Sequence, residues 1–263
     1  MVDSHIYPAN WGVRPVLFNL GGLPVPSYSF FVLLGLAAGI AFYFIDARKN
    51  KAANENTFFI FIAALTFGAL GAKLPIWIAN YQLIMANPTN LSLLLSGRTI
   101  IGGLIGGTIG VILTKKVLKI KDKRGNQFAP AGAIGIAIGR IGCFLRGCCY
   151  GIPKYASWGV DFGDGVLRHP TQLYEAVFDF CLFIYLLIIR KNVTEPGKLF
   201  RIFLNWYFAF RFFIEFIRVE KIAFLGLTGF QLVSIMVLLY INRKLIAELF
   251  LGRMRNGRKQ FEQ

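Results

Sequence analysis

Seven long apolar runs of about 16–24 residues alternate with short polar stretches along the 263-residue chain. A helix needs about 20 apolar residues to cross the hydrocarbon core of a bilayer. Helices are the expected spanning form, because no water is available there to bind backbone N–H and C=O groups. The pattern therefore predicts seven transmembrane helices, at residues 27–45, 57–80, 98–114, 127–145, from 171 onward, 199–217 and 228–242.

The polar segments between these runs give the rest of the organisation. Residues 1–26 are rich in proline and indicate an outer segment that lies along the membrane surface, and residues 81–97 carry Asn-Pro turn signals. The loop 146–170 is long beside the usual connection of about 4–6 residues, so we expect it to cap or line a site. No basic region precedes a long apolar core near the start, and a cleaved signal peptide is not expected. We find no repeat, linker or second domain, and predict one integral membrane domain over residues 1–263.

Composition agrees with this pattern. Hydrophobic residues make up 56% of the chain and charged residues 16%, whereas a soluble domain carries about 25% charged residues. The predicted fold class is therefore an all-α membrane protein, a polytopic bundle of seven transmembrane helices.

The net charge of +16 is distributed unevenly along the chain. Most lysines and arginines follow the first, third, fifth and seventh runs, and few lie in the alternate segments. Cytoplasmic loops carry this excess, so we expect the N-terminus outside and the C-terminus in the cytoplasm. Topology and attraction to anionic lipid account for the charge, and a nucleic-acid partner is not expected.

Glycines recur at small-xxx-small spacing in two of the predicted spans. They are Gly102, Gly103, Gly106, Gly107 and Gly110 in the third, and Gly132, Gly135, Gly139 and Gly142 in the fourth. Such spacing lets another helix or a lipid approach the backbone closely, and helix packing is the ordinary explanation for each glycine.

Ionisable and polar residues inside the spans form three groups. These are Arg140 in the fourth span, Gln172, Glu175 and Asp179 on one face of the fifth, and Arg211, Glu215 and Arg218 on one face of the sixth. Charges within a membrane are costly and by default indicate function. We expect these groups to form an arginine-bearing cavity in the outer half of the bilayer.

Two interpretations of this cavity remain open from the residues alone. Buried ion pairs, such as Arg211 with Glu215, would hold the helices in register. Alternatively, Arg140 and an arginine of the sixth span bind an anionic head group, because a guanidinium matches a phosphate bidentately and stays charged when desolvated. The anion to expect in a membrane is a phospholipid phosphate.

Three cysteines and one histidine lie close to these charges in sequence. Cys143, Cys148 and Cys149 fit nucleophiles, a disulfide, metal ligands or small residues of a turn. The C-x4-C-C spacing is not a standard zinc spacing, and few histidines are available, so we predict no metal site. His169 could accept a proton near pH 7 or organise the turn before Pro170.

Several separated motifs, in order along nearly the whole chain, resemble the bacterial prolipoprotein diacylglyceryl transferase family. They are Tyr28 with Gly35, Gly102-Gly103-Leu104-Ile105-Gly106, Ala129-Pro130, Gly139-Arg140-Ile141-Gly142 with Phe144 and Gly151, Arg168-His169-Pro170-Thr171-Gln172-Leu173-Tyr174-Glu175, and Arg211-Phe212 through Glu215 to Arg218.

The resemblance implies a seven-span enzyme of the bacterial cytoplasmic membrane. Such enzymes move the diacylglyceryl group of phosphatidylglycerol to the lipobox cysteine thiol in the signal-peptide region of a prolipoprotein. It implies no cofactor and no metal. The catalytic candidates are Arg140 and Arg211 as phosphate ligands, Glu215 orienting Arg211, and His169 and Cys143 as replacements for a base. The substrate-binding candidates are Tyr28, Gly102, Gly103, Gly142, Gly151, Gln172, Tyr174, Glu175 and Arg218.

The chain departs from the family pattern at four positions. Ile101 stands where the family usually has His, Cys143 and Cys148 replace a signature Asn and Glu, and Asn126 replaces an Asp. Two alternatives follow from these departures. One is a paralogue that uses the same phospholipid site on another acceptor, with a lipid adduct at Cys143 or Cys148. The other is a non-catalytic lipid-binding or redox-sensitive membrane protein.

Overall fold

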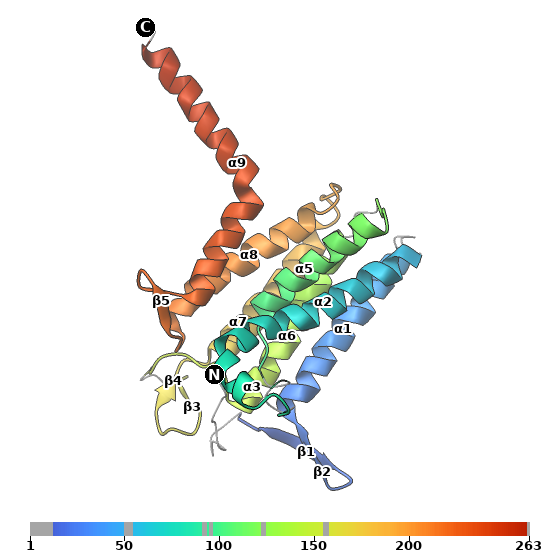
Figure 1. The fold of residues 1–263 in the computed structure, drawn as a ribbon, viewed down its shortest axis with the longest axis vertical. Coiled ribbons are helices and arrows are strands. Elements are labelled where there is room, and N and C mark those ends of the chain that lie inside the picture. The colour runs from blue at the N-terminus through green and yellow to red at the C-terminus, as the bar shows by residue number, and fades with distance from the viewer. Residues whose placement is uncertain are drawn as a thin grey trace.

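The computed structural model describes residues 13–49, 55–90, 94, 97–121, 125–154 and 158–261. Residues 1–12 of the predicted outer segment lie outside these ranges. Long helices dominate the architecture (Figure 1), and their bounds are α1 Ser27–Lys49, α2 Glu55–Ala79, α5 Ile100–Val117, α6 Gly125–Arg146, α7 Thr171–Ile189, α8 Lys198–Ile214 and α9 Gly229–Phe261. A short helix, α3 (Tyr81–Ala86), lies in the predicted loop after α2, and a 3-10 turn, η1 (Glu215–Ile217), follows α8.

Six helices in the described part of the chain are long and apolar enough to cross a membrane: α1, α2, α5, α6, α7 and the first 20 residues of α9. The counterpart of the sixth predicted span is α8, which has 17 residues and carries Arg201 and Arg211. It is shorter and more polar than the other six. The fold is thus a mostly helical membrane protein, and the charged α8 differs from the rest of the bundle.

Three short antiparallel hairpins interrupt the helices, and the hydrophobic pattern did not predict them. They pair β1 (Val16–Leu20) with β2 (Leu23–Pro26), β3 (Val160–Asp161) with β4 (Leu167–Arg168), and β5 (Ile222–Phe224) with β6 (Leu227–Thr228). Gly21 and Gly22 both have positive φ in the first turn, the backbone that a two-residue hairpin loop requires. All three hairpins lie at the same end of the bundle as α3 (Figure 1).

Glycines bring two pairs of helices into direct backbone contact. A Cβ added at Gly102 or Gly106 of α5 would clash with the backbone of α2, at Gly71 and Phe67 respectively. A Cβ added at Gly35 of α1 would meet the carbonyl oxygen of Gly135 in α6. The predicted close packing at the glycine spacings is therefore confirmed for α5 and α6.

Gly106→Ala should destabilise the α2–α5 pair by about 1–3 kcal/mol, because a well-packed contact has no room for an added methyl group. The measurement is unfolding of the purified protein in mixed micelles that contain an increasing fraction of denaturing detergent. Gly139→Ala is the matched control, since nothing lies within 4 Å of its added Cβ. Equal stability of the two variants would contradict the contact described above.

Candidate functional site

A buried carboxylate on α7 lies at the centre of the predicted polar groups. Glu175 is 1% exposed and forms ion pairs with three arginines. Arg140 reaches it from α6, Arg211 Nη1 from α8 at 3.0 Å, and Arg218 Nη1 from beyond η1 at 2.9 Å. The predicted groups thus converge, and one acid on α7 joins α6 to the arginines at the end of α8 and just after η1.

A second carboxylate, Glu215, fixes two of these arginines from another side. Arg211 Nη2 donates to it at 2.8 Å, which confirms the predicted ion pair, and Arg218 Nε lies 3.5 Å away. Thr228 Oγ1 donates to Glu215 at 3.3 Å, while the Thr228 N–H donates to Gln231 Oε1 at 2.9 Å. Sequence analysis missed Thr228 and Gln231, whose signal was two polar residues at the start of an apolar run.

The local backbone explains how Arg218 reaches the cluster. Arg211, Glu215 and Arg218 were expected on one face of a regular helix, but α8 ends at Ile214 and η1 follows. Arg218 itself is extended, at φ −96° and ψ 153°. Although burial alone would lower the pKa of Arg218, the adjacent Glu175 carboxylate raises it, so this guanidinium stays charged.

The predicted polar face of α7 is confirmed. Gln172, Glu175 and Asp179 are 0%, 1% and 1% exposed. Within the described part of the chain, both carboxylate oxygens of Asp179 and the Nε of Arg140 have no hydrogen-bond partner. Buried polar atoms normally find one. Of these two residues, Arg140 lines the cavity described next, whereas Asp179, like Gln172 and Glu175, does not.

A cavity of about 2190 Å³ adjoins the arginine cluster. Its walls are mostly apolar surfaces of α1, α2, α5, α6 and α8. Its polar lining residues include Tyr28, Arg98, Arg140, Arg146, Arg211 and Arg218 together with the three clustered cysteines Cys143, Cys148 and Cys149. A long apolar chamber with guanidinium groups on its wall suits a molecule with an anionic head and hydrocarbon chains.

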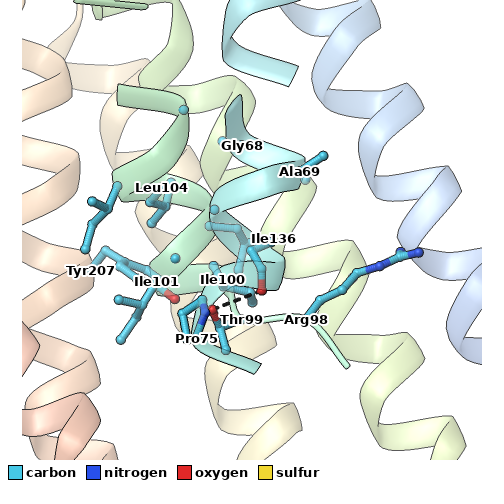
Figure 2. A pocket seen from close by; sticks show the side chains of 18 of the residues that line it. Gly68, Ala69, Pro75, Arg98, Thr99, Ile100, Ile101, Leu104, Ile136 and Tyr207 are labelled. Atoms are coloured by element: carbon cyan, nitrogen blue, oxygen red, sulfur yellow. Dashed lines mark hydrogen bonds between the residues drawn. The ribbon is translucent and has the colours of Figure 1, made fainter. Parts of the chain in front are cut away.

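Figure 2 shows one wall of this cavity, where Ile101, Leu104 and Tyr207 lie close together. Thr99 Oγ1 donates to the Ala72 carbonyl oxygen at 3.3 Å and ties the start of α5 to α2. Arg98 extends away from this wall, towards the side of the cavity that α1 borders (Figure 2). Ile101 belongs to the apolar core, so the position at which the resembling family usually has His offers no proton acceptor here.

Three thiols gather where α6 ends, with Cys143 in its last turn and Cys148 and Cys149 in the segment that follows. The sulfur atoms of Cys143, Cys148 and Cys149 all lie within 4.8 Å of one another, and these cysteines are free thiols. Hydrogen bonds with the Cys143 and Cys148 thiols lower the pKa of Cys149, and nearby Arg218 and Arg140 lower it further.

Of the remaining predicted residues, some lie at the cavity and others lie outside it. Tyr28 lines the cavity, with the Arg146 guanidinium 5.2 Å from its ring centroid, and a Cβ at Gly142 would press against Tyr28 and Phe31. His169 Nδ1 lies 3.2 Å from Tyr174 Oη. Neither His169 nor Tyr174 is among the described residues that line the cavity.

Gly151 and His169 lie in the loop before α7. A Cβ at Gly151 would clash with the Ile217 carbonyl oxygen, so this glycine allows the loop to approach η1. Partial burial lowers the pKa of His169, and Lys154 lowers it further, so the imidazole is neutral at pH 7.

A family model and individual relatives identify the same family for this chain. A family model described as prolipoprotein diacylglyceryl transferase matches residues 15–244. The chain is 35% identical over 217 residues to a phosphatidylglycerol–prolipoprotein diacylglyceryl transferase of Clostridium tetani, covering 78% of this chain and 86% of that protein. It is 32% identical over 244 residues to phosphatidylglycerol–prolipoprotein diacylglyceryl transferase 2 of Clostridium perfringens, covering 86% and 92%.

Glu175→Gln should lower the free energy of unfolding by about 3–5 kcal/mol, because removing one partner leaves buried charges uncompensated. The measurement is again unfolding in mixed micelles. The control is Glu195→Gln, which removes an exposed carboxylate paired with Lys198 and should cause no measurable change. A wild-type unfolding curve for Glu175→Gln would show that the three arginines do not depend on this acid.

Proposed function

The chain belongs to the prolipoprotein diacylglyceryl transferase family, and from this premise we propose that it moves the diacylglyceryl group of phosphatidylglycerol to a prolipoprotein cysteine. The names of its relatives state this donor and this acceptor. The observation that carries the proposal is the arginine cluster on the wall of a large, mostly apolar cavity. Lipidation by such a transferase is a step in lipoprotein biosynthesis.

The phosphate of the donor binds Arg140 and Arg211 in this proposal. Arg140 Nε has no hydrogen-bond partner among the described residues, so it has a donor to offer a phosphate oxygen. Glu175 and Glu215 fix the two guanidinium groups in advance. The two interpretations that were open from the residues alone are therefore compatible, because the same ion pairs that join the helices also preorganise the phosphate ligands.

The reaction forms one bond and breaks another. The acceptor sulfur attacks the terminal carbon of the diacylglyceryl group, the carbon–oxygen bond to the phosphate breaks, and glycerol phosphate leaves with the electron pair. Negative charge then develops on the phosphate oxygen, where the arginines stabilise it more strongly than in the bound lipid. The thiol proton leaves to a base, and the product is a thioether.

The cavity would hold the acyl chains of the donor. Its apolar walls come from helices that are long enough to cross the bilayer, so lipid chains exchange hydrocarbon surroundings for protein at little cost. Gly139 lines the cavity, and nothing lies within 4 Å of a Cβ added there, so the backbone of α6 is accessible beside Arg140.

We further propose seven spans, with α8 as the additional one, in the bacterial cytoplasmic membrane. The hairpin end of the bundle would face outwards and the C-terminus would be cytoplasmic. Basic residues support this orientation, since Arg48, Lys49, Lys115 and Lys116 fall in the last turns of α1 and α5. The sulfur cluster begins in the last turn of α6 and would lie on the outer side, where prolipoproteins present their cysteine.

Arg140→Ala and Arg211→Ala should each lower the transfer rate by about 10²–10³-fold, the usual cost of losing one stabilising donor. Arg140→Lys should also be impaired, because an ammonium cannot bind the phosphate bidentately. The assay combines purified protein, phosphatidylglycerol vesicles and a lipobox peptide, with the diacylglyceryl-modified peptide measured by mass spectrometry. Arg190→Ala is the matched control, since Arg190 pairs with Asp46 away from the cluster.

Full activity of Arg140→Ala would refute the phosphate assignment. A second candidate function is transfer of the lipid to another acceptor. The same assay would detect it, because three thiols line the cavity. A diacylglyceryl adduct on Cys143 or Cys148, with an unmodified peptide, would indicate a different acceptor. Absence of any lipid transfer, beside an active relative, would exclude a transferase.

His169 stays a predicted proton acceptor and can be tested by pH. Its pKa is lowered from 6.5, so a base at this position is neutral at pH 7 and becomes protonated only below that value. If it accepts the thiol proton, the transfer rate should fall as the pH drops through the lowered pKa. His169→Gln should remove this acid limb and lower the rate at pH 7. An unchanged pH profile would assign the proton to another group.

A further inference from the structure

The three clustered cysteines have no role in the function proposed above, although they adjoin the site. Cys143 and Cys148 are buried and Cys149 is half-buried, and all three line the cavity. A group of three thiols this close together is unusual for residues that serve only to fill a turn.

The backbone is held in a strained form that brings the thiols together. Gly147 and Cys149 both have positive φ, of 77° and 66°, and Cys149 is not a glycine. A residue with a side chain rarely adopts this conformation, and it persists where the surroundings enforce it. The Cys148 N–H donates to the Cys143 carbonyl oxygen at 3.1 Å, which folds the segment back on the end of α6.

The first two residues of α7 fix the same segment from the other side. Thr171 Oγ1 donates to the Cys149 carbonyl oxygen at 2.7 Å, and the Gln172 side-chain amide donates to that of Cys148. Three buried or half-buried carbonyl oxygens are thus hydrogen-bonded, and the thiols project from a fixed backbone. Hydrogen bonds around a metal site help to hold its ligands in place.

The spacing of the sulfur atoms is close to that of a tetrahedral zinc site. With Zn–S bonds of about 2.3 Å, ligand sulfurs lie about 3.8 Å apart. The three sulfurs here lie within 4.8 Å of one another, so the widest pair would close by about 1 Å on binding. The C-x4-C-C spacing alone did not predict such a site, because it depends on the positive φ at two positions.

Three protein ligands leave one position of a tetrahedral ion open. Structural zinc sites use four protein ligands, whereas three ligands and an open position are typical of catalytic sites. Because all three cysteines line the cavity that also contains Arg140, the open position faces the space where donor and acceptor would meet.

We propose that Cys143, Cys148 and Cys149 bind one Zn²⁺ ion whose open fourth position takes the acceptor cysteine as a thiolate. Soft thiolates favour zinc among the common divalent ions, and a thiol that coordinates zinc is deprotonated. The binding part of this inference stands on the cysteine geometry alone, and the acceptor part rests on the proposed transferase function. Coordination to zinc would deprotonate the acceptor thiol without a side-chain base, and Ile101, on the cavity wall, cannot act as one.

The step balances without a further reagent. The acceptor thiol loses its proton to water as its sulfur binds zinc. That sulfur then attacks the diacylglyceryl carbon, the carbon–oxygen bond breaks, and glycerol phosphate leaves with the electron pair. The thioether is a weaker ligand than the thiolate, so the product leaves the metal. Arg140 and Arg218 interact electrostatically with Cys149 and offset the negative charge of three thiolates around a divalent ion.

The binding test measures zinc in the full-length protein in detergent. After exposure to Zn²⁺ and removal of loose metal by a weak chelator, elemental analysis should find about one zinc per chain. Cys148→Ser and the triple serine variant should lose it. Cys181→Ser is the matched control, because Cys181 is the fourth free cysteine and lies exposed on α7. Equal zinc in the wild type and the triple variant would overturn the site, as would a Cys148–Cys149 disulfide in the unreduced protein.

Cobalt gives a second measurement that needs no variant. Wild-type protein loaded with Co²⁺ should show the thiolate-to-cobalt absorption and the visible bands of a tetrahedral ion. A lipobox peptide with cysteine should shift the visible bands, and the same peptide with serine should not. Absence of the thiolate band overturns the site, and a thiolate band that the cysteine peptide leaves unchanged overturns the acceptor role.

The transfer assay separates this inference from the proposed function. Chelated, metal-free protein should lose at least about 10²-fold in rate and regain it with Zn²⁺, in line with the usual contribution of one electrostatic stabiliser. Full transfer without metal would overturn the zinc role and leave the transferase intact. A cobalt shift with the cysteine peptide, in a protein that never transfers lipid, would support the site and refute the transferase.

Discussion

The structure depends on a single buried acid that satisfies three arginines. Glu175 lies on α7 and joins α6 to α8 and to Arg218, which follows η1 directly after α8. In a low-dielectric interior each of these charges is costly alone, and only the assembled group is tolerable. The ion pairs therefore decide both where the helices meet and where cations are available beside the cavity, so stability and ligand binding come from the same atoms.

Sequence analysis predicted the parts of the fold that follow from local periodicity. The apolar runs predicted the long helices, and the i, i+3 and i+7 spacing predicted the buried face of α7. The glycine spacings predicted a close approach to α5, and the structure identifies α2 as the helix that makes it. The shared helical face of Arg211, Glu215 and Arg218 was predicted in outline, but the change to a 3-10 turn was not. That change depends on the partners Glu175 and Thr228, which lie in other elements.

What the sequence could not supply is proximity between distant or non-helical positions. The hairpins have two to five residues per strand, too few for a periodic signal, although Gly21-Gly22 marked one turn. The cluster of Cys143 with Cys148 and Cys149 depends on left-handed backbone at two residues and on hydrogen bonds from Thr171 and Gln172. No rule of spacing contains this information, so the thiols remained ambiguous until they were placed in space.

The short length of α8 has a consequence for how the protein enters the membrane during synthesis. As the seventh span proposed above, α8 would carry Arg211 in its last turn and Arg201 in its first, and it has only 17 residues to offset a charge that costs up to about 2.5–3.5 kcal/mol at the centre of an isolated helix. Its partner Glu175 lies in α7, which is made earlier, so this carboxylate is already present when Arg211 leaves the ribosome. The order of the elements along the chain thus supplies one counter-charge before α8, which would insert by joining a helix that is already in place.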